Sequence, residues 1–142
     1  MKKYQVFLLI GIIISLIVTV FLMLFSFKLI DYGTSEEYRL KLIQAYTTGL
    51  QFDDGFTPEE HAQIMQMGYL IEGVIGIVIS ILSCISIILS SISIFVSKKA
   101  LFILTIIFGF PFGSVFSGIG GIMGIIYMNE NKIETNTKNI YY

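Results

Sequence analysis

One uncharged stretch, residues 73–97, constrains this chain more than any other and has the sequence GVIGIVISILSCISIILSSISIFVS. Small residues recur along it every three or four positions, at an average step of about 3.4, close to the 3.5-residue repeat of a helix–helix seam. They are Gly73, Gly76, Ser80, Ser83, Ser86, Ser90, Ser93 and Ser97. Large aliphatic residues fill the positions between them, which reverses the pattern of a water-soluble helix. Because lipid tails are as apolar as leucine, helices in a bilayer associate through small residues. The stripe therefore predicts an all-α integral membrane helix bundle.

The composition agrees with a bilayer as the solvent. The chain of 142 residues is 55% hydrophobic and 13% charged, about half the charged fraction of a soluble domain. This length predicts a single membrane domain over residues 1–142. The formal net charge of -1 provides no basic patch, so we expect no nucleic-acid partner. The single cysteine, Cys84, excludes an internal disulfide, and we expect it to be a small buried apolar residue.

The first predicted span covers residues 6–27. This apolar run of about 22 residues would be roughly 33 Å long as a helix, which exceeds the ~30 Å hydrocarbon core of a bilayer. A signal peptide has an apolar core of only ~7–15 residues, so we expect this span to remain uncleaved. Gly11, Ser15 and Thr19 lie four residues apart and would form a row that packs against the serine stripe.

The polar region 28–68 predicts a helical loop with two helices. Residues 34–37 (TSEE) form a capping box with its first threonine as the expected cap, and the helix that follows should end near Gly49. Residues 57–60 (TPEE) provide a cap, a proline at the first helical position and a closing glutamate. We expect the helix that starts there to continue unbroken into the second span, residues 70–97.

Residues 100–128 form an apolar run of about 29 residues, roughly 43 Å as a straight helix, too long for one untilted span and too short for two. Its centre, FGFPFG at 108–113, predicts a break, because proline removes a helix hydrogen bond. Two arrangements remain open: one tilted span, or a hairpin with a short segment at 99–110 and a second at 112–128. After the break, small residues recur at Gly113, Ser117 and Gly121.

Lysines predict the orientation. The pairs at 2–3 and 98–99 flank the first two spans on one side, which is therefore the cytoplasmic side. The N-terminus is then inside, and the acidic loop 28–68 is extracytoplasmic. A hairpin would also place Lys132 and Lys138 inside, whereas a single tilted span would leave the tail outside, so the side of the C-terminus stays open.

The order of these features resembles a known family. A basic N-terminus and first span precede an outward loop that ends in TPEE at 57–60, a long second span closes on the lysine pair 98–99, and GIGGIMGII follows at 118–126. This layout resembles the bacterial membrane-protein family catalogued as domain of unknown function 4064. The resemblance implies four helical segments, a place in the bacterial cytoplasmic membrane and no assigned activity. The segment that corresponds to the family's third helix, 98–110, is shorter here.

Few side chains suggest chemistry. A local acidic cluster with one imidazole matches no metal motif, so we expect no metal and no other cofactor. It consists of Asp53, Asp54, Glu59, Glu60 and His61. Glu72 is the one charge that adjoins the apolar core; it is either an interfacial acid that reaches water or, on a sharper hypothesis, an ion- or proton-binding carboxylate. The sequence contains no motif of a nucleophile with its base, so we do not expect an enzyme.

The sequence thus predicts a bundle of three to four transmembrane segments with an extracytoplasmic helical loop. We interpret its serines as packing residues, because pores usually carry intramembrane charges. The residues expected to pack the helices are Gly11, Ser15, Thr19, Gly76, Ser83, Ser90, Ser97, Gly113, Ser117 and Gly121. The expected function is that of a small non-catalytic membrane protein with an accessory or protective (immunity- or envelope-type) role; the alternative is a small oligomeric channel or transporter. Expected partners are the lipid bilayer and either a larger membrane protein or a second copy.

Overall fold

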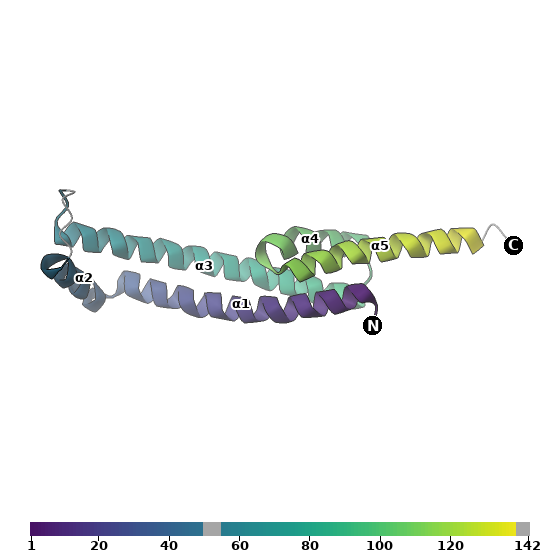
Figure 1. The fold of residues 1–142 in the computed structure, drawn as a ribbon, viewed down its shortest axis with the longest axis horizontal. Coiled ribbons are helices and arrows are strands. Elements are labelled where there is room, and N and C mark those ends of the chain that lie inside the picture. Colours follow the sequence, from purple (N-terminus) through teal and green to yellow (C-terminus); the bar gives the residue numbers. More distant parts are fainter. Residues whose placement is uncertain (50–54, 139–142) are drawn as a thin grey trace. The chain divides into compact units, whose positions relative to one another are not determined.

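The computed structural model describes residues 1–49 and 55–138, with side chains described up to residue 132. That part of the chain contains five α-helices and no strand, which confirms the predicted all-α class (Figure 1). The helices are α1 (Lys3–Thr34), α2 (Glu36–Thr48), α3 (Pro58–Phe95), α4 (Lys99–Phe112) and α5 (Val115–Lys138). By length and composition, α1 and α3 are the two helices among these residues that are long and apolar enough to cross a membrane.

The chain divides into two compact units. The hairpin unit consists of residues 1–20 together with the chain from residue 79 onward, and the loop unit consists of residues 21–78. The hairpin unit therefore contains the start of α1, the end of α3, and α4 and α5. The loop unit contains the end of α1, all of α2 and the start of α3.

Within the hairpin unit, α4 and α5 form an antiparallel hairpin (Figure 1). A Cβ atom added at Gly109 would lie 2.9 Å from the backbone nitrogen of Gly118. A Cβ atom added at Gly121 would lie 2.9 Å from the carbonyl oxygen of Phe102. Gly109, the later of the two α4 residues, thus meets Gly118, the earlier of the two α5 residues. This order of contacts requires that the two helices run in opposite directions. The structure therefore contains the hairpin and not one continuous helix over 100–128.

The helix break predicted at residues 108–113 falls at the C-terminal end of α4. Pro111 is accommodated in the last turn of α4, which ends at Phe112. Gly113 caps the helix by donating its backbone N–H to the Gly109 carbonyl oxygen at 3.0 Å. The hairpin turn consequently consists of residues 113 and 114. Helix α4 matches the expected segment 99–110 within two residues, whereas α5 begins at Val115 and continues to Lys138, ten residues beyond the expected end at 128.

The two predicted helix starts in the loop unit have different outcomes. The box at residues 57–60 is confirmed: the Thr57 N–H and hydroxyl each donate to Glu60 Oε2 at 2.8 Å, and the Glu60 N–H donates to Thr57 Oγ1 at 3.3 Å. The cap of α2 is Ser35 and not Thr34, because α1 extends through Thr34, whose hydroxyl donates back to the Ile30 carbonyl oxygen at 2.9 Å. The expected end of this helix at Gly49 is confirmed.

Burial in the described chain is inverted relative to a water-soluble protein. The buried polar side chains are Ser15, Thr19, Ser26, Ser80, Ser83, Ser86, Ser90, Ser93, Thr105 and Ser117. The buried apolar side chains are fewer and are Tyr4, Leu8, Leu29, Ala62 and Phe102. Large aliphatic and aromatic side chains are exposed along both long helices, among them Phe21 and Leu24 of α1 and Ile81 and Ile88 of α3.

Candidate functional site

The serine stripe of α3 faces the interior of the hairpin unit. Its five buried members there are Ser80, Ser83, Ser86, Ser90 and Ser93. Their spacing of three or four residues keeps them on one face of the helix, while Ile81, Ile88 and Ile92 on other faces are exposed. We call these five serines the serine seam.

Two members of the serine seam hold the hairpin. The Ser83 hydroxyl donates to the carbonyl oxygen of Phe112 at the end of α4, a group that the helix itself leaves without a partner. The hydroxyls of Ser93 and Thr105 lie 3.0 Å apart, and Thr105 donates to the Leu101 carbonyl oxygen at 2.9 Å. Both contacts join α3 to α4, so the seam connects helices through hydroxyl hydrogen bonds as well as through close approach.

The small-residue row of α1 lies against the start of α5. Gly11 is buried, and a Cβ atom there would lie 2.7 Å from the backbone nitrogen of Ser117. The Ser114 hydroxyl donates to the Gly11 carbonyl oxygen at 3.3 Å. Ser15 and Thr19, which follow on the same face of α1, are also buried. Glycine at position 11 thus permits a contact between backbones that any side chain would prevent.

Three further residues expected to pack helices also lie at close contacts. A Cβ atom at Gly113 would meet the Ser86 hydroxyl, and one at Gly121 would meet α4. Gly76 belongs to the loop unit, where it is buried and a Cβ atom would meet the side chain of Ser26. All these positions tolerate no larger residue without movement of a neighbour.

Four buried hydroxyl oxygens in the hairpin unit have no hydrogen-bond partner: those of Ser15, Thr19, Ser86 and Ser90. A buried hydroxyl without a partner costs roughly 1–3 kcal/mol, so four of them, two on α1 and two on α3, are a substantial cost for residues that only pack helices. The sequence indicated these residues as small, but their lack of partners depends on the tertiary contacts.

Three sequence-predicted positions lie elsewhere. Ser97 follows the end of α3, is exposed, and has its hydroxyl 2.9 Å from that of Tyr4, so it joins the ends of α1 and α3 outside the seam. Glu72 is exposed beside the buried Gly73 and is not enclosed between helices. The expectation of a buried Cys84 is wrong: it is exposed, because it follows a seam serine by one residue and therefore points about 100° away from the seam.

The acidic cluster is only partly described. Glu59 and Glu60 lie in the first turn of α3, and His61 stacks on Tyr46 with ring centroids 5.0 Å apart. Asp53 and Asp54 fall outside the described residues. Over residues 1–49 and 55–138, no group of three or more His, Cys, Asp and Glu side chains is arranged to hold a metal ion.

A tyrosine cluster, not predicted as such, holds α2 in the loop unit. Tyr38 of α2 stacks on Tyr32 of α1 with centroids 4.6 Å apart and meets Tyr69 of α3 edge-on at 5.9 Å. A hydrogen bond to Tyr69, together with burial, raises the pKa of Tyr38 to about 12. The Gln66 side chain donates to the Ser35 carbonyl oxygen at 2.9 Å and so ties α3 to the joint between α1 and α2. None of the residues of α2 is fully buried, yet the helix is attached at its start to both long helices.

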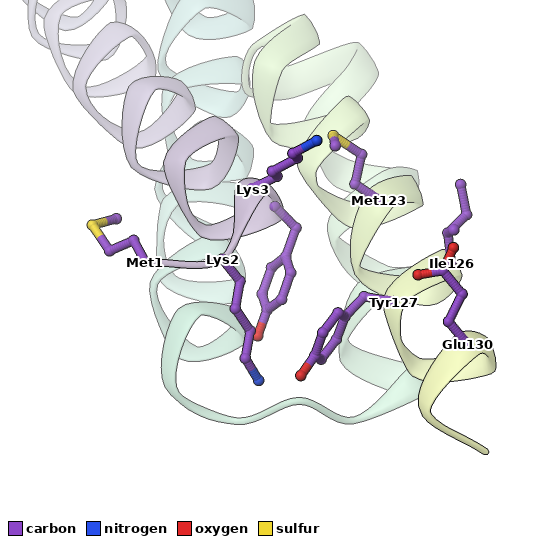
Figure 2. Close-up of a pocket in the computed structure, with 8 residues that line it drawn as sticks. Met1, Lys2, Lys3, Met123, Ile126, Tyr127 and Glu130 are labelled. Atoms are coloured by element: carbon purple, nitrogen blue, oxygen red, sulfur yellow. The ribbon is translucent and has the colours of Figure 1, made fainter. Parts of the chain in front are cut away.

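A pocket of about 470 Å³ opens at the N-terminal end of the hairpin unit, between the start of α1 and the middle of α5 (Figure 2). It is lined by Met1, Lys2, Lys3, Tyr4, Met123, Ile126, Tyr127 and Glu130. Among the residues of α5, Met123 and Tyr127 lie four positions apart and share one face, and Ile126 and Glu130 lie four positions apart on a neighbouring face. Sequence reasoning missed this pocket, because its two walls are more than a hundred residues apart in the chain.

No family model matches the chain, and neither a curated protein nor a solved structure matches it. The fold and the burial pattern by themselves define an all-helical protein with two helices long and apolar enough to cross a membrane.

Proposed function

We propose that this chain is a multi-pass integral membrane protein of the bacterial cytoplasmic membrane with a non-catalytic accessory or protective role. The observation that carries the membrane assignment is the inverted burial: serine and threonine hydroxyls are inside, and isoleucine, leucine and phenylalanine are outside. In water this arrangement would expose the groups whose burial drives folding. In lipid, the exposed apolar groups face a solvent of their own polarity, and small residues make the helix contacts.

In this proposal, α1 and α3 cross the bilayer fully and the hairpin enters it from the cytoplasmic side. The 14 residues of α4 extend about 21 Å, less than the ~30 Å of the hydrocarbon core. The hairpin turn therefore lies inside the bilayer, and α5 returns to the side of Lys98 and Lys99. The Ser83 hydrogen bond to the last carbonyl of α4 supports this, since a helix end inside lipid needs a protein partner. Membership of the domain-of-unknown-function-4064 family stays part of the proposal, with the sequence layout as its support.

The accessory or protective role is supported by the form of the loop unit. Helix α2 contacts α1 and α3 through Tyr38 and contacts α3 again through Tyr46, while its other face is exposed at residues 40, 41, 44 and 45. Its surface carries the ion pairs Glu36–Arg39 and Glu37–Lys41. Leu40 is 59% exposed on the surface of α2. Burial of such an apolar side chain against a partner would contribute favourable free energy to binding. We infer that α2 is a recognition surface on the extracytoplasmic side for a larger membrane protein.

Cysteine labelling tests the topology. In a Cys84→Ser background, we expect Leu40→Cys on α2 to react with a membrane-impermeant maleimide in intact cells. Lys132→Cys on α5 should react only after permeabilisation, because α5 returns to the cytoplasm. Labelling of Lys132→Cys in intact cells would contradict the hairpin topology, and no labelling of Leu40→Cys in intact cells would contradict the extracytoplasmic position of α2.

Affinity purification in mild detergent tests the role. We expect Leu40→Ser to reduce recovery of the membrane partner that co-purifies with the wild-type chain. Ala45→Ser is the matched control, because Ala45 is also exposed on α2 but lies about 140° around the helix from Leu40. Equal recovery with both variants would refute α2 as the recognition surface.

The second candidate, a small oligomeric channel or transporter, is favoured by the four buried hydroxyls that lack partners. In that case ion flux into liposomes should exceed that of empty liposomes and should fall with Ser90→Ala. Ser91→Ala is the control, because Ser91 already donates to the Ile87 carbonyl oxygen at 2.8 Å. Flux at the level of empty liposomes would leave the accessory or protective role as the better proposal.

A further inference from the structure

The four buried hydroxyls that lack a partner form two pairs, one on each long helix. Ser15 and Thr19 of α1 are 2% and 6% exposed, and Ser86 and Ser90 of α3 are both 0% exposed. The members of each pair lie four residues apart and therefore on one helix face, with Cβ atoms roughly 5–6 Å from each other. Two hydroxyl hydrogen bonds of about 2.8 Å in series span this separation, whereas one does not.

Other hydroxyls of the hairpin unit find a partner in their own helix. Ser91 and Thr105 each donate to the carbonyl oxygen four residues earlier, at 2.8 and 2.9 Å, which is a common arrangement for these residues inside a helix. Ser86 instead faces the hairpin turn, because a Cβ atom at Gly113 would meet its hydroxyl. The four unpartnered hydroxyls therefore need a partner other than a carbonyl of their own helix.

The two pairs lie close to the hairpin turn, residues 113–114. Ser86 contacts Gly113 from α3, and the Ser114 hydroxyl donates to the Gly11 carbonyl oxygen of α1 at 3.3 Å. Ser15 follows Gly11 by one helical turn on the same face. Both helices thus present an unpartnered hydroxyl within about one turn of the point where α4 ends and α5 begins.

The contact between the ends of α1 and α3 gives the same register. The Tyr4 hydroxyl lies 2.9 Å from the Ser97 hydroxyl, so the start of α1 meets the residues just beyond α3 and the two helices run antiparallel. Ser15 lies eleven residues after Tyr4, and Ser86 lies eleven residues before Ser97. Ser15 and Ser86 are therefore at nearly the same level within the hairpin unit.

Water has the chemistry that these pairs require. A water molecule both donates and accepts, and buried waters typically make about three hydrogen bonds to polar groups that the protein leaves unsatisfied. One water about 2.8 Å from each hydroxyl of a pair would give both hydroxyls a partner. A metal cation would need more oxygen ligands than two hydroxyls provide.

We propose that the hairpin unit binds two internal waters, one that joins Ser86 to Ser90 and one that joins Ser15 to Thr19. These waters complete the hydrogen bonding of the helices on either side of the hairpin turn. They also satisfy all four hydroxyls without a continuous pore. The inference goes beyond the accessory or protective role and does not depend on it, because it concerns contacts within the hairpin unit alone.

Water-edited solid-state NMR of the full chain in lipid bilayers tests the α3 site directly. Magnetisation from water should reach the Cβ signals of Ser86 and Ser90 before that of Ser93. Ser93 is the matched control, because it is also 0% exposed but its hydroxyl lies 3.0 Å from that of Thr105. Ser93 is also the nearest of the three to the end of α3. Transfer from bulk water alone would therefore reach Ser93 first and Ser86 last, and that order would overturn the proposal.

The stability of alanine variants in SDS mixed micelles provides a second test. With a bound water, Ser86→Ala should lower the folding equilibrium constant by roughly 2- to 12-fold relative to Ser91→Ala, the equivalent of one hydrogen bond worth about 0.5–1.5 kcal/mol. Ser91→Ala makes the same change on α3 at a hydroxyl whose bond to its own helix adds little stability. Without water, Ser86→Ala would remove an unsatisfied hydroxyl and raise the constant by roughly 5- to 140-fold. An unchanged or higher constant would overturn the proposal.

A double-mutant cycle shows whether one water serves both hydroxyls. Ser90→Ala should cause a loss like that of Ser86→Ala, and the double variant should lose less than the product of the two single losses, because both release the same water. Losses that multiply would indicate separate partners and would also overturn the shared water. Ser15→Ala with Thr19→Val decides the α1 pair by the same criterion. If an alanine variant does not fold, the order of NMR transfer in the wild-type chain decides for α3.

Discussion

Replacement of Gly109 by alanine provides a quantitative test of the α4–α5 contact. The added Cβ would lie 2.9 Å from the Gly118 nitrogen and 3.2 Å from the Ser117 carbonyl carbon, which are backbone atoms that no rotamer change can move away. Forcing extra atoms into a packed contact costs about 1–3 kcal/mol. Alanine also gains about 0.5–1 kcal/mol over glycine inside a helix, which partly offsets this cost.

Gly68→Ala is the control that isolates the packing contribution. Gly68 lies within α3, and a Cβ atom there meets nothing within 4 Å, so this variant should show only the gain in helix propensity. The difference between the free energies of unfolding of the two variants should therefore be about 1–3 kcal/mol, with Gly109→Ala the less stable. Because the chain contains no tryptophan, unfolding by SDS in mixed micelles is best followed by circular dichroism. Equal stability of the two variants, or greater stability of Gly109→Ala, would refute the close approach of α4 and α5.

Three further predictions concern the helix start, a titration and a label. The hydrogen bonds from Thr57 lower the pKa of Glu60, so the capping box should contribute its full stability above pH 4.5 and lose it as the pH falls through the lower pKa of the folded state. Amide hydrogen exchange in the first turn of α3 should therefore become faster on acidification. The variant Thr57→Ala, at a cost of about 1 kcal/mol, should make this exchange faster already at pH 7. The absorbance titration of Tyr38 should have its midpoint at about pH 12. The hydrogen bond of the Tyr38 hydroxyl therefore stabilises the folded protein below about pH 10, and this stabilisation is lost as the pH rises towards 12. The variant Tyr69→Phe should move the midpoint towards 10, and an unchanged midpoint would contradict the hydrogen bond. Wild-type Cys84, exposed on the apolar surface of α3, should resist impermeant maleimide in membranes and react once the protein is denatured; rapid labelling in intact membranes would indicate contact with water.

The composition of the core indicates which interactions stabilise the bundle. Its core contains few large apolar side chains, and the cluster of Tyr4, Leu8 and Phe102 is confined to one end of the hairpin unit. At Gly11 and Gly121 the backbones of neighbouring helices come into close contact. In the bilayer that we propose for this chain, dispersion contacts and a few hydroxyl hydrogen bonds would replace the burial of apolar area as the source of stability. A bundle of this kind should be more sensitive to added methyl groups than to deleted ones.

The order and type of the helices followed from the sequence alone, because the signals that specify them are local, although α1 extends seven residues and α5 ten residues beyond the predicted spans. The apolar run at 6–27, the box at 57–60 and the small-residue stripe each depend on residues within one or two helical turns. The stripe also indicated which face of α3 carries small residues, since the helical period determines the faces without reference to any neighbour. The one-residue error at the cap of α2 arose because Thr34 and Ser35 can each serve as a cap, and only the length of α1 decides between them.

The tertiary structure decided everything that depends on how one helix is rotated and shifted against another. The sequence allowed either a tilted span or a hairpin over 100–128, and the close approach of Gly109 to Gly118 selects the hairpin. Which hydroxyls find a carbonyl and which remain without a partner depends on the same fit between helices. The pocket brings Lys3 to Met123 across most of the chain's length, and no local pattern encodes such a contact, because its free energy arises only when both helices are in place.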